Sequence, residues 1–248
     1  MLNTSTAYFC RPWWLRRVLQ PLSALSALML LSACGALQIN TEHVSQNQDS
    51  RVQFVVLHYT SSDLQQSLKT LTQKGVSSHY LINDAPPTIY QLVDESRRAW
   101  HAGTSQWQGR TWLNASSIGI ELVNPGYRET EQGRVWFAYP EGQIDQLISL
   151  LKDIRQRHDL PIDSIIGHSD IAPQRKVDPG PLFPWQRLAD AGLIRWPAAE
   201  QVAARQAAYG TDLPDALWFQ QQLHAVGFQI IFSGEFDEQT RNVLAAFQ

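Results

Sequence analysis

The strongest constraint on the fold is an apolar run at residues 52–57 that ends directly before His58. Its sequence, Val-Gln-Phe-Val-Val-Leu, is rich in branched and aromatic side chains, and a short run of this kind is typical of a buried β-strand. Because active sites of sheet proteins form where strands end, His58 is a candidate functional residue.

Further strands and helices alternate along the chain. Three leucines at helical spacing behind a Ser-Ser-Asp cap predict a helix over residues 61–72. Apolar residues repeat at three- and four-residue steps over 141–158, and this amphipathic helix should cover one face of a sheet. The other expected elements are strands at 78–82, 88–93, 118–123 and 164–167 and a closing helix at 185–191. This alternation predicts an α/β domain over residues 51–196, with a mixed central β-sheet flanked by helices.

The C-terminal part of the chain has no strand pattern. Residues 197–212 are rich in alanine and glutamine and are expected to form a linker that is partly helical. Residues 213–248 carry two amphipathic segments, which predict a small all-α module.

The N-terminus has the pattern of a processing signal. Arginines precede an apolar stretch at 18–31 that is too short and too interrupted to span a membrane, so residues 1–33 are expected to be a signal peptide. The run Leu31-Ser32-Ala33-Cys34 resembles the lipobox at which bacterial lipoproteins are cut and acylated. That resemblance implies a lipid on Cys34, a tether at 34–50 and, from Gly35, the periplasmic face of the outer membrane. The alternative is an ordinary secretory signal that ends near a cysteine.

Charge and cysteine content narrow the class of partner. Lysines and arginines number 20 against 23 aspartates and glutamates, a formal net charge of −3, and no basic run is long enough to follow a phosphate backbone. We therefore expect no nucleic-acid partner and a neutral or sugar-like substrate. Once the signal is removed only Cys34 remains, so the fold must rest on packing and metal rather than on a disulfide.

Candidate metal ligands are His58, His168 and Asp178. Two neutral imidazoles and one carboxylate leave a zinc ion with net positive charge and an open position, which holds an acidified water. The spacing alone is a weak indication, because the histidines lie far apart in the sequence and only a fold could bring them together. Asp170, two residues after His168, is a rival ligand on this reasoning.

Five separated blocks add context: Val-Leu-His at 56–58, Val-Ser-Ser-His-Tyr-Leu-Ile at 76–82, Ala-Trp-His-Ala-Gly at 99–103, Ser-Ile-Gly-Ile-Glu at 117–121 and a block at 167–180 that begins Gly-His-Ser-Asp. In this order they resemble the type 2 N-acetylmuramoyl-L-alanine amidases, which are related to T7 lysozyme and to peptidoglycan recognition proteins. The resemblance covers residues 52–196 and is greatest to the lipoprotein amidases of the Gram-negative outer membrane.

The resemblance implies a role for each matching residue. It places one zinc ion on His58, His168 and Asp178, and so favours Asp178 over Asp170. It implies that Glu121 handles the protons of the attacking water and that Lys176 stabilises the oxyanion. Both roles are chemically reasonable, since a carboxylate near an acidified water can take its proton and an ammonium can offset developing negative charge.

Three other residues are candidates for substrate contact: Tyr59, His79 and His101. The two histidines could equally be packed and hydrogen-bonded within the fold, because each is next to an aromatic residue. Trp107 and Trp112 could stack on sugar rings, although tryptophans also build cores.

The C-terminal segment resembles a small helical peptidoglycan-binding module, through Leu223-His224-Ala225-Val226-Gly227-Phe228 and Gly234-Glu235-Phe236-Asp237. Such modules continue beyond the Phe-Gln pair at which this sequence stops, which leaves open whether the module is complete and whether it binds.

The activity implied by the family is hydrolysis of the amide between the lactyl group of (anhydro-)N-acetylmuramic acid and L-alanine in peptidoglycan, for cell-wall turnover or recycling. The expected partners are peptidoglycan or muropeptides and, through the lipid, a membrane, and we expect a monomer. Two alternatives are a recognition protein that binds without cleaving and a metallopeptidase that cuts within the stem peptide. The sequence leaves open the preference between intact wall and anhydro-muropeptides and the length of stem peptide required.

Overall fold

The computed structural model describes residues 37–210 and 212–248. The expected signal peptide and Cys34 lie outside these residues. Residues 37–48 belong to a unit of their own with no helix or strand, and residues 49–248 form the second unit, which carries all the regular structure below. None of the helices described is both long and apolar enough to cross a membrane.

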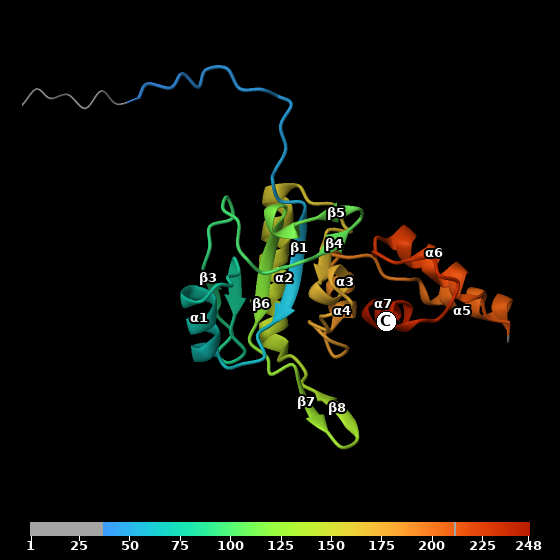
Figure 1. The fold of residues 1–248 in the computed structure, drawn as a ribbon. Coiled ribbons are helices and arrows are strands. Elements are labelled where there is room, and N and C mark those ends of the chain that lie inside the picture. The colour runs from blue at the N-terminus through green and yellow to red at the C-terminus, as the bar shows by residue number, and fades with distance from the viewer. Residues whose placement is uncertain (1–36, 211) are drawn as a thin grey trace, which may run out of the picture. The chain divides into compact units, whose positions relative to one another are not determined.

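A five-stranded sheet with the order β3-β2-β6-β1-β9 forms the centre of the fold (Figure 1). Its strands are β1 (Phe54–Tyr59), β2 (Tyr80–Ile82), β3 (Ile89–Gln91), β6 (Ser117–Leu122) and β9 (Ile165–Gly167). Strand β1 pairs in parallel with both β6 and β9, β2 pairs in parallel with β6, and only the edge strand β3 is antiparallel to its neighbour. The prediction of a mixed central sheet with β1 as a buried strand is confirmed.

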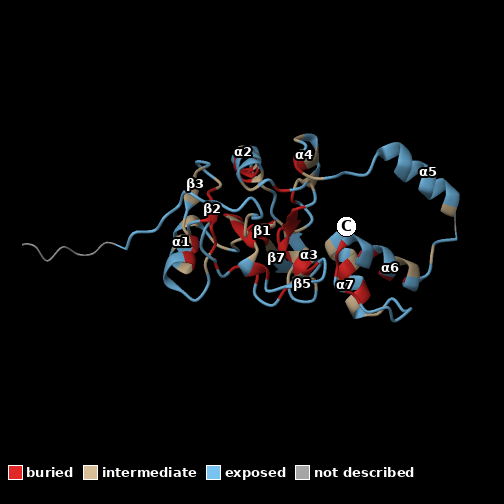
Figure 2. Cartoon of the chain, turned by 90° about the horizontal axis from the view of Figure 1, so that it is seen from above, coloured by how far each residue is buried: buried red, intermediate tan, exposed pale blue. Residues whose placement is uncertain are grey.

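One face of the sheet is covered by α2 (Glu141–His158) and α4 (Trp185–Asp190), which lie on the same side in Figure 2. Side chains alternate along a strand, so Val55 and Leu57 of β1 point to this face. They share a buried cluster with Ile144, Leu147 and Leu151 of α2. The predicted amphipathic helix therefore has the bounds and the role that its periodicity indicates.

The opposite face is divided between two covers. Helix α1 (Leu64–Gln73) packs over the β2 end, where Leu71 meets Leu81. Helix α3 (His168–Ile171) and the C-terminal helices pack over β1 and β9, where Phe54, Val56 and Ile166 enter a second buried cluster. Between these covers, the carboxyl ends of β1 and β6 remain accessible.

Three helices end the chain: α5 (Ala199–Tyr209), α6 (Ala216–Val226) and α7 (Glu238–Phe247). Helix α5, in the predicted linker, has no buried residue and is mostly pale blue in Figure 2. Helices α6 and α7 are joined by the fully buried Gln220, which donates to Ser233 and Thr240 and accepts from the Gly234 amide. Leu223 and Val243 complete the second buried cluster, so these helices share a core with the sheet.

Several short elements were not predicted from the sequence. They are α3, the hairpins β4 (Gln106–Trp107) with β5 (Arg110–Thr111) and β7 (Tyr127–Thr130) with β8 (Gly133–Trp136), and the 3-10 helix η2 (Leu113–Ala115). Such segments are too short to show a period. The first helix begins at Leu64, behind the predicted Ser-Ser-Asp cap, because Asp63 accepts the Gln66 amide as the N-cap.

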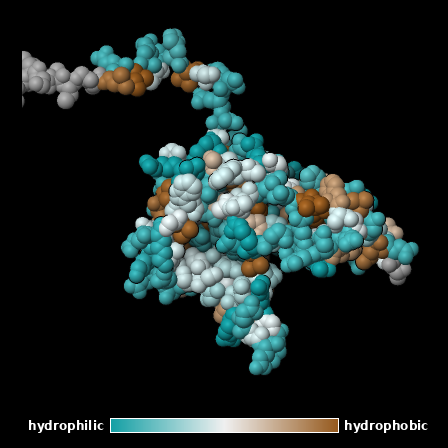
Figure 3. All heavy atoms as spheres, viewed as in Figure 1, coloured by the Kyte–Doolittle hydropathy of each residue, from teal (hydrophilic) through white to brown (hydrophobic). Residues whose placement is uncertain are grey.

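The face of the molecule shown in Figure 3 is mainly polar. On this face, hydrophobic residues are scattered in small groups among hydrophilic ones. Single exposed apolar residues are ordinary on a water-exposed surface and need no partner.

At the other end of the sheet, Glu95 joins several segments in one polar network. Its carboxylate accepts the hydroxyl of Tyr80 at 2.7 Å, Nη2 of Arg157 at 2.9 Å and Nε2 of His158 at 2.7 Å. Burial opposes the ionisation of Glu95, but these hydrogen bonds outweigh it and hold its pKa at about 2, below the ordinary value of 4.5. The network ties β2 to the C-terminal end of α2.

We expect Glu95→Gln to lower the free energy of unfolding by about 2 kcal/mol at pH 7, because Arg157 loses its buried ionic partner. A carboxylate with a lowered pKa stabilises the fold above its unfolded pKa and loses that effect as the pH falls to its folded value. The difference between variant and wild type should therefore shrink between pH 4.5 and 2. Urea unfolding at several pH values measures it. Glu129→Gln, in an exposed pair with Arg134, is the control and should change stability by less than about 0.5 kcal/mol. A pH-independent loss in Glu95→Gln would contradict this account.

Candidate metal and catalytic site

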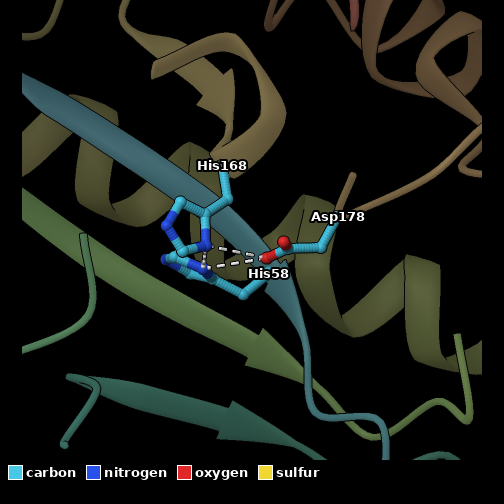
Figure 4. Close-up of side chains that lie close together, drawn as sticks. All are labelled: His58, His168 and Asp178. Carbon is cyan, nitrogen blue, oxygen red and sulfur yellow. Dashed lines mark hydrogen bonds and ion pairs between the residues drawn. The ribbon is translucent and has the colours of Figure 1, made fainter. Parts of the chain in front are cut away.

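Three buried donor atoms converge at the carboxyl end of β1. His58 shares the strand face of Phe54 and Val56, and His168 is the first residue of α3, directly after β9. The two Nδ1 atoms lie 2.9 Å apart, and Oδ2 of Asp178 lies 3.2 Å from His58 Nδ1 and 3.0 Å from His168 Nδ1 (Figure 4). The side chains of a strand, a helix and a loop thus point at one another.

This donor set fits a divalent metal ion. His168 Nε2 lies 3.2 Å from the carbonyl of Ala102 and donates to it, so Nδ1 carries a lone pair that faces the carboxylate. Two acceptors at this distance repel one another unless a cation lies between them. A tetrahedral zinc ion with ligand bonds of about 2.0 Å holds its ligand atoms about 3.3 Å apart, close to the observed spacing. Burial, and then the neighbouring His168, lower the pKa of His58 to about 4, so His58 is neutral, as a metal ligand must be, at physiological pH.

The rival carboxylate has a different role. Oδ2 of Asp170 accepts the backbone N–H of Gly167 at 2.6 Å and so caps α3. Burial raises the pKa of Asp170 to about 7, although this hydrogen bond opposes the shift. Of the two aspartates, only Asp178 belongs to the donor cluster.

Glu121 lies beside the donors on the neighbouring strand. It is paired with His58 in the β1–β6 register, so both side chains leave the sheet on the same face. Its Oε2 is buried without a hydrogen-bond partner among the described residues. Burial, followed by the charge of Asp178, raises the pKa of Glu121 to about 8, and Lys176 offsets this only in part. A carboxyl group that titrates near neutral pH is suited to transfer protons.

A cavity of about 380 Å³ opens onto these groups. Lys176 contributes to its wall from the loop before Asp178. Within residues 37–210 and 212–248 the Lys176 ammonium makes no hydrogen bond or ion pair, so it is available to a ligand. Trp100 and Tyr127 also line the cavity. The sequence reasoning did not single them out, since their place at the wall depends on distant segments.

The candidate substrate residues occupy different environments. Tyr59 lines the cavity, and burial, then the charge of Asp178, raise the pKa of its hydroxyl, which stays neutral. His79 is fully buried; its Nδ1 accepts the amide of Gly119 at 3.0 Å, so Nε2 is protonated and donates to the Arg97 carbonyl at 3.1 Å. His101 borders the cavity but lies behind His58, with its Nδ1 3.1 Å from His58 Nε2.

The two tryptophans considered for sugar stacking also differ. Trp107 is buried and makes an edge contact with Phe228 of the C-terminal segment, which removes its faces from solvent. Trp112 is 76% exposed. Of these two candidates, Trp112 is therefore the one whose ring is exposed to solvent.

Comparison with known proteins agrees with this geometry. The profile of the family described as N-acetylmuramoyl-L-alanine amidase matches residues 48–181. The chain is 38% identical over 261 residues to the N-acetylmuramoyl-L-alanine amidase AmiD of Escherichia coli, covering 90% of this chain and 95% of that relative. It is 42% identical over 100 residues to the 1,6-anhydro-N-acetylmuramyl-L-alanine amidase AmpD of Enterobacter cloacae, covering 40% of this chain and 49% of AmpD.

Solved structures show the same fold. AmpDh3 from Pseudomonas aeruginosa, in complex with anhydromuramic pentapeptide, superposes with a TM-score of 0.77 at 36% identity over 86% of this chain and 88% of that chain. AmiD from E. coli, in complex with anhydro-N-acetylmuramic acid-L-Ala-D-gamma-Glu-L-Lys, superposes with a TM-score of 0.70 at 35% identity over 86% of this chain and 95% of that chain. Because the family profile spans more than half of the sequence and AmiD aligns over nearly its whole length, this chain belongs to the N-acetylmuramoyl-L-alanine amidases.

Proposed function

We propose that the chain is a zinc amidase that holds one zinc ion through His58, His168 and Asp178 and cleaves the amide between the lactyl group of muramic acid and L-alanine. The observation that carries the proposal is the convergence of three buried donors beside an unpaired carboxyl oxygen, at the floor of an open cavity. Zinc, when bound there, supplies an acidified water and a Lewis acid for the substrate carbonyl.

Glu121 is the proton carrier in this proposal. Its Oε2 has no hydrogen-bond partner among the residues that the structure describes, so it can take a proton from the attacking water and return it to the nitrogen of the leaving L-alanine. The pKa of about 8 for Glu121 is that of the protein with no cation bound among the three donors. A bound cation would lower it, which brings Glu121 closer to the ionised form that accepts the proton.

Lys176 stabilises negative charge on the substrate. The tetrahedral intermediate of amide hydrolysis carries that charge on the former carbonyl oxygen, and a positioned ammonium offsets it. Lys176 suits this task because it lies at the cavity wall and no acidic side chain of the described residues engages it. Tyr59, at the same wall, can offer its neutral hydroxyl to the substrate.

For the substrate we favour anhydro-muropeptides. The ligands named for the AmpDh3 and AmiD structures are an anhydromuramic pentapeptide and an anhydro-muramyl tripeptide, and both proteins superpose over most of this chain. An enzyme of this specificity would act in wall turnover or recycling.

We further propose that the protein is a lipoprotein anchored through Cys34 to the periplasmic face of the outer membrane, with residues 34–50 as a tether. The support is the lipobox-like run together with the exposed and mostly polar character of residues 38–49. Helices α6 and α7 would correspond to the small module that resembles peptidoglycan-binding modules, and the enzyme would act as a monomer.

The metal site predicts opposite behaviour for two aspartates. Asp178→Asn should reduce bound zinc from about one ion per chain to almost none, because an amide is a poor zinc ligand. Asp170→Asn should retain the ion, because its side-chain oxygen still accepts the Gly167 amide. Dialysis followed by elemental analysis measures both. Metal loss in Asp170→Asn with retention in Asp178→Asn would reverse the ligand assignment.

The proton role of Glu121 predicts a loss of rate without a loss of metal. Glu121→Gln should lower kcat on an anhydro-muramyl tripeptide by at least about 100-fold, since the amide cannot accept a proton. Zinc content should stay unchanged, because Glu121 is not among the donors. Mass analysis of the products identifies the bond that is cut. Products that begin elsewhere in the stem would indicate a metallopeptidase, and tight binding without turnover in the wild type would indicate a recognition protein.

A further inference from the structure

We propose that His101 is a positioning residue, which holds His58 in the one tautomer that can bind a metal ion. The inference rests on the metal site of the proposed function. In this proposal His101 supports the metal site and does not contact the substrate. Ser117 and Asn114 in turn hold His101 in place through hydrogen bonds.

Hydrogen bonds link His58, His101 and Ser117 to the carbonyl of Leu113. Because this carbonyl can only accept, it determines which group is the donor in each of these hydrogen bonds. The hydroxyl of Ser117 lies 2.6 Å from the carbonyl of Leu113, which can only accept, so Ser117 donates there. His101 Nε2 lies 3.2 Å from the Ser117 oxygen and donates to it. His101 Nδ1 is then an acceptor, and His58 Nε2, 3.1 Å away, must be its donor. His58 is left with its Nδ1 lone pair directed at His168 and Asp178.

The other ligand histidine is supported from the next residue. His168 Nε2 donates to the carbonyl of Ala102, so one dipeptide, His101-Ala102, contacts the outer nitrogen of both histidines. The backbone of this dipeptide is itself held, because Oδ1 of the buried Asn114 accepts the N–H of His101 at 3.0 Å and that of Ala102 at 2.8 Å. The side chain of Asn114 therefore fixes the position of the backbone that contacts both ligand histidines.

The sheet has room for the His101 ring because residue 119 is a glycine. His101 lies over Gly119 of β6, where a Cβ atom would stand 2.4 Å from Cγ of His101. Any larger residue at 119 would push the imidazole off the strand. The ring is buried and both of its nitrogens are engaged, so none is free for a substrate.

The tautomer of His58 matters because only one of the two neutral forms can bind a metal ion through Nδ1. With the proton on Nε2, His58 offers a lone pair to a cation; with the proton on Nδ1, it would direct an N–H at the same point. Loss of an outer partner of a ligand histidine typically weakens metal binding by roughly 10- to 100-fold.

A matched pair of variants tests the proposal in the full chain. The side-chain oxygen of asparagine can replace Nδ1 of His101, whereas glutamine places its amide near Nε2 and leaves His58 without its acceptor. We expect His101→Asn to bind zinc within about 3-fold of wild type and His101→Gln to bind roughly 10- to 100-fold more weakly, in competition with a chelator. A role in packing alone predicts the reverse order, because glutamine is closer to histidine in size. Equal affinities, or the reverse order, would overturn the inference.

A second measurement does not need metal or activity. Nitrogen chemical shifts of the imidazoles distinguish the two tautomers in the zinc-free protein, and His58 should be protonated on Nε2 in wild type. Ser117→Ala removes one buried oxygen and leaves the backbone in place, and it should give His101 and His58 mixed tautomers. A single unchanged tautomer in Ser117→Ala, or His58 protonated on Nδ1 in wild type, would refute the hydrogen-bond chain.

The two proposals fail in different ways. If wild type binds no zinc, or binds it equally well as Asp178→Asn, the proposed metal site is wrong. If wild type binds zinc and Asp178→Asn does not, while His101→Gln binds as wild type does, only the inference about His101 is wrong.

Discussion

The parallel pairing of β1 with β6 on one side and β9 on the other is the interaction on which the rest of the structure depends. Strands of a parallel sheet usually have both faces covered, and the alternation of side chains along β1 decides which residues meet each cover. Val55 and Leu57 enter the core under α2, and His58 leaves on the other face. The same register sets Glu121 opposite His58, so Glu121 and the donor atoms lie on one face of the sheet.

The face opposite α2 explains why an active-site cavity can exist. Helix α1 covers one end and α3 with α6 and α7 covers the other, and each is held by its own buried cluster. The C-terminal helices are thus part of the support of the catalytic face, since Leu223 and Val243 pack in the cluster that contains Val56. The part of this face between the two covers borders the cavity and carries titratable side chains, among them His58 and Glu121.

Those side chains carry an energetic cost. Among the described residues, three buried donor groups lie at hydrogen-bonding distance from one another and a carboxyl oxygen has no hydrogen-bond partner, and each of these features costs folding free energy. A cation bound among the three donors would offset part of this cost. The outer groups of the histidines have partners: His168 Nε2 lies at the Ala102 carbonyl, His101 Nε2 at the Ser117 hydroxyl, and the His101 N–H donates to Asn114.

Local sequence determined the elements whose patterns are long enough to read. The branched run of β1 and the helical repeat of α2 follow from side-chain periodicity alone, and the five spaced blocks indicated the family before any geometry was known. Tertiary structure decided the rest. The burial of His79 and the place of His101 behind His58 depend on distances between segments far apart in the chain. The family resemblance had already favoured Asp178 over Asp170, and the distances among the three donors agree with that choice. Periodicity indicates which face of its own helix or strand a side chain occupies. Whether a histidine on that face is a metal ligand, supports a ligand or packs in the core depends on which residues of distant segments contact it.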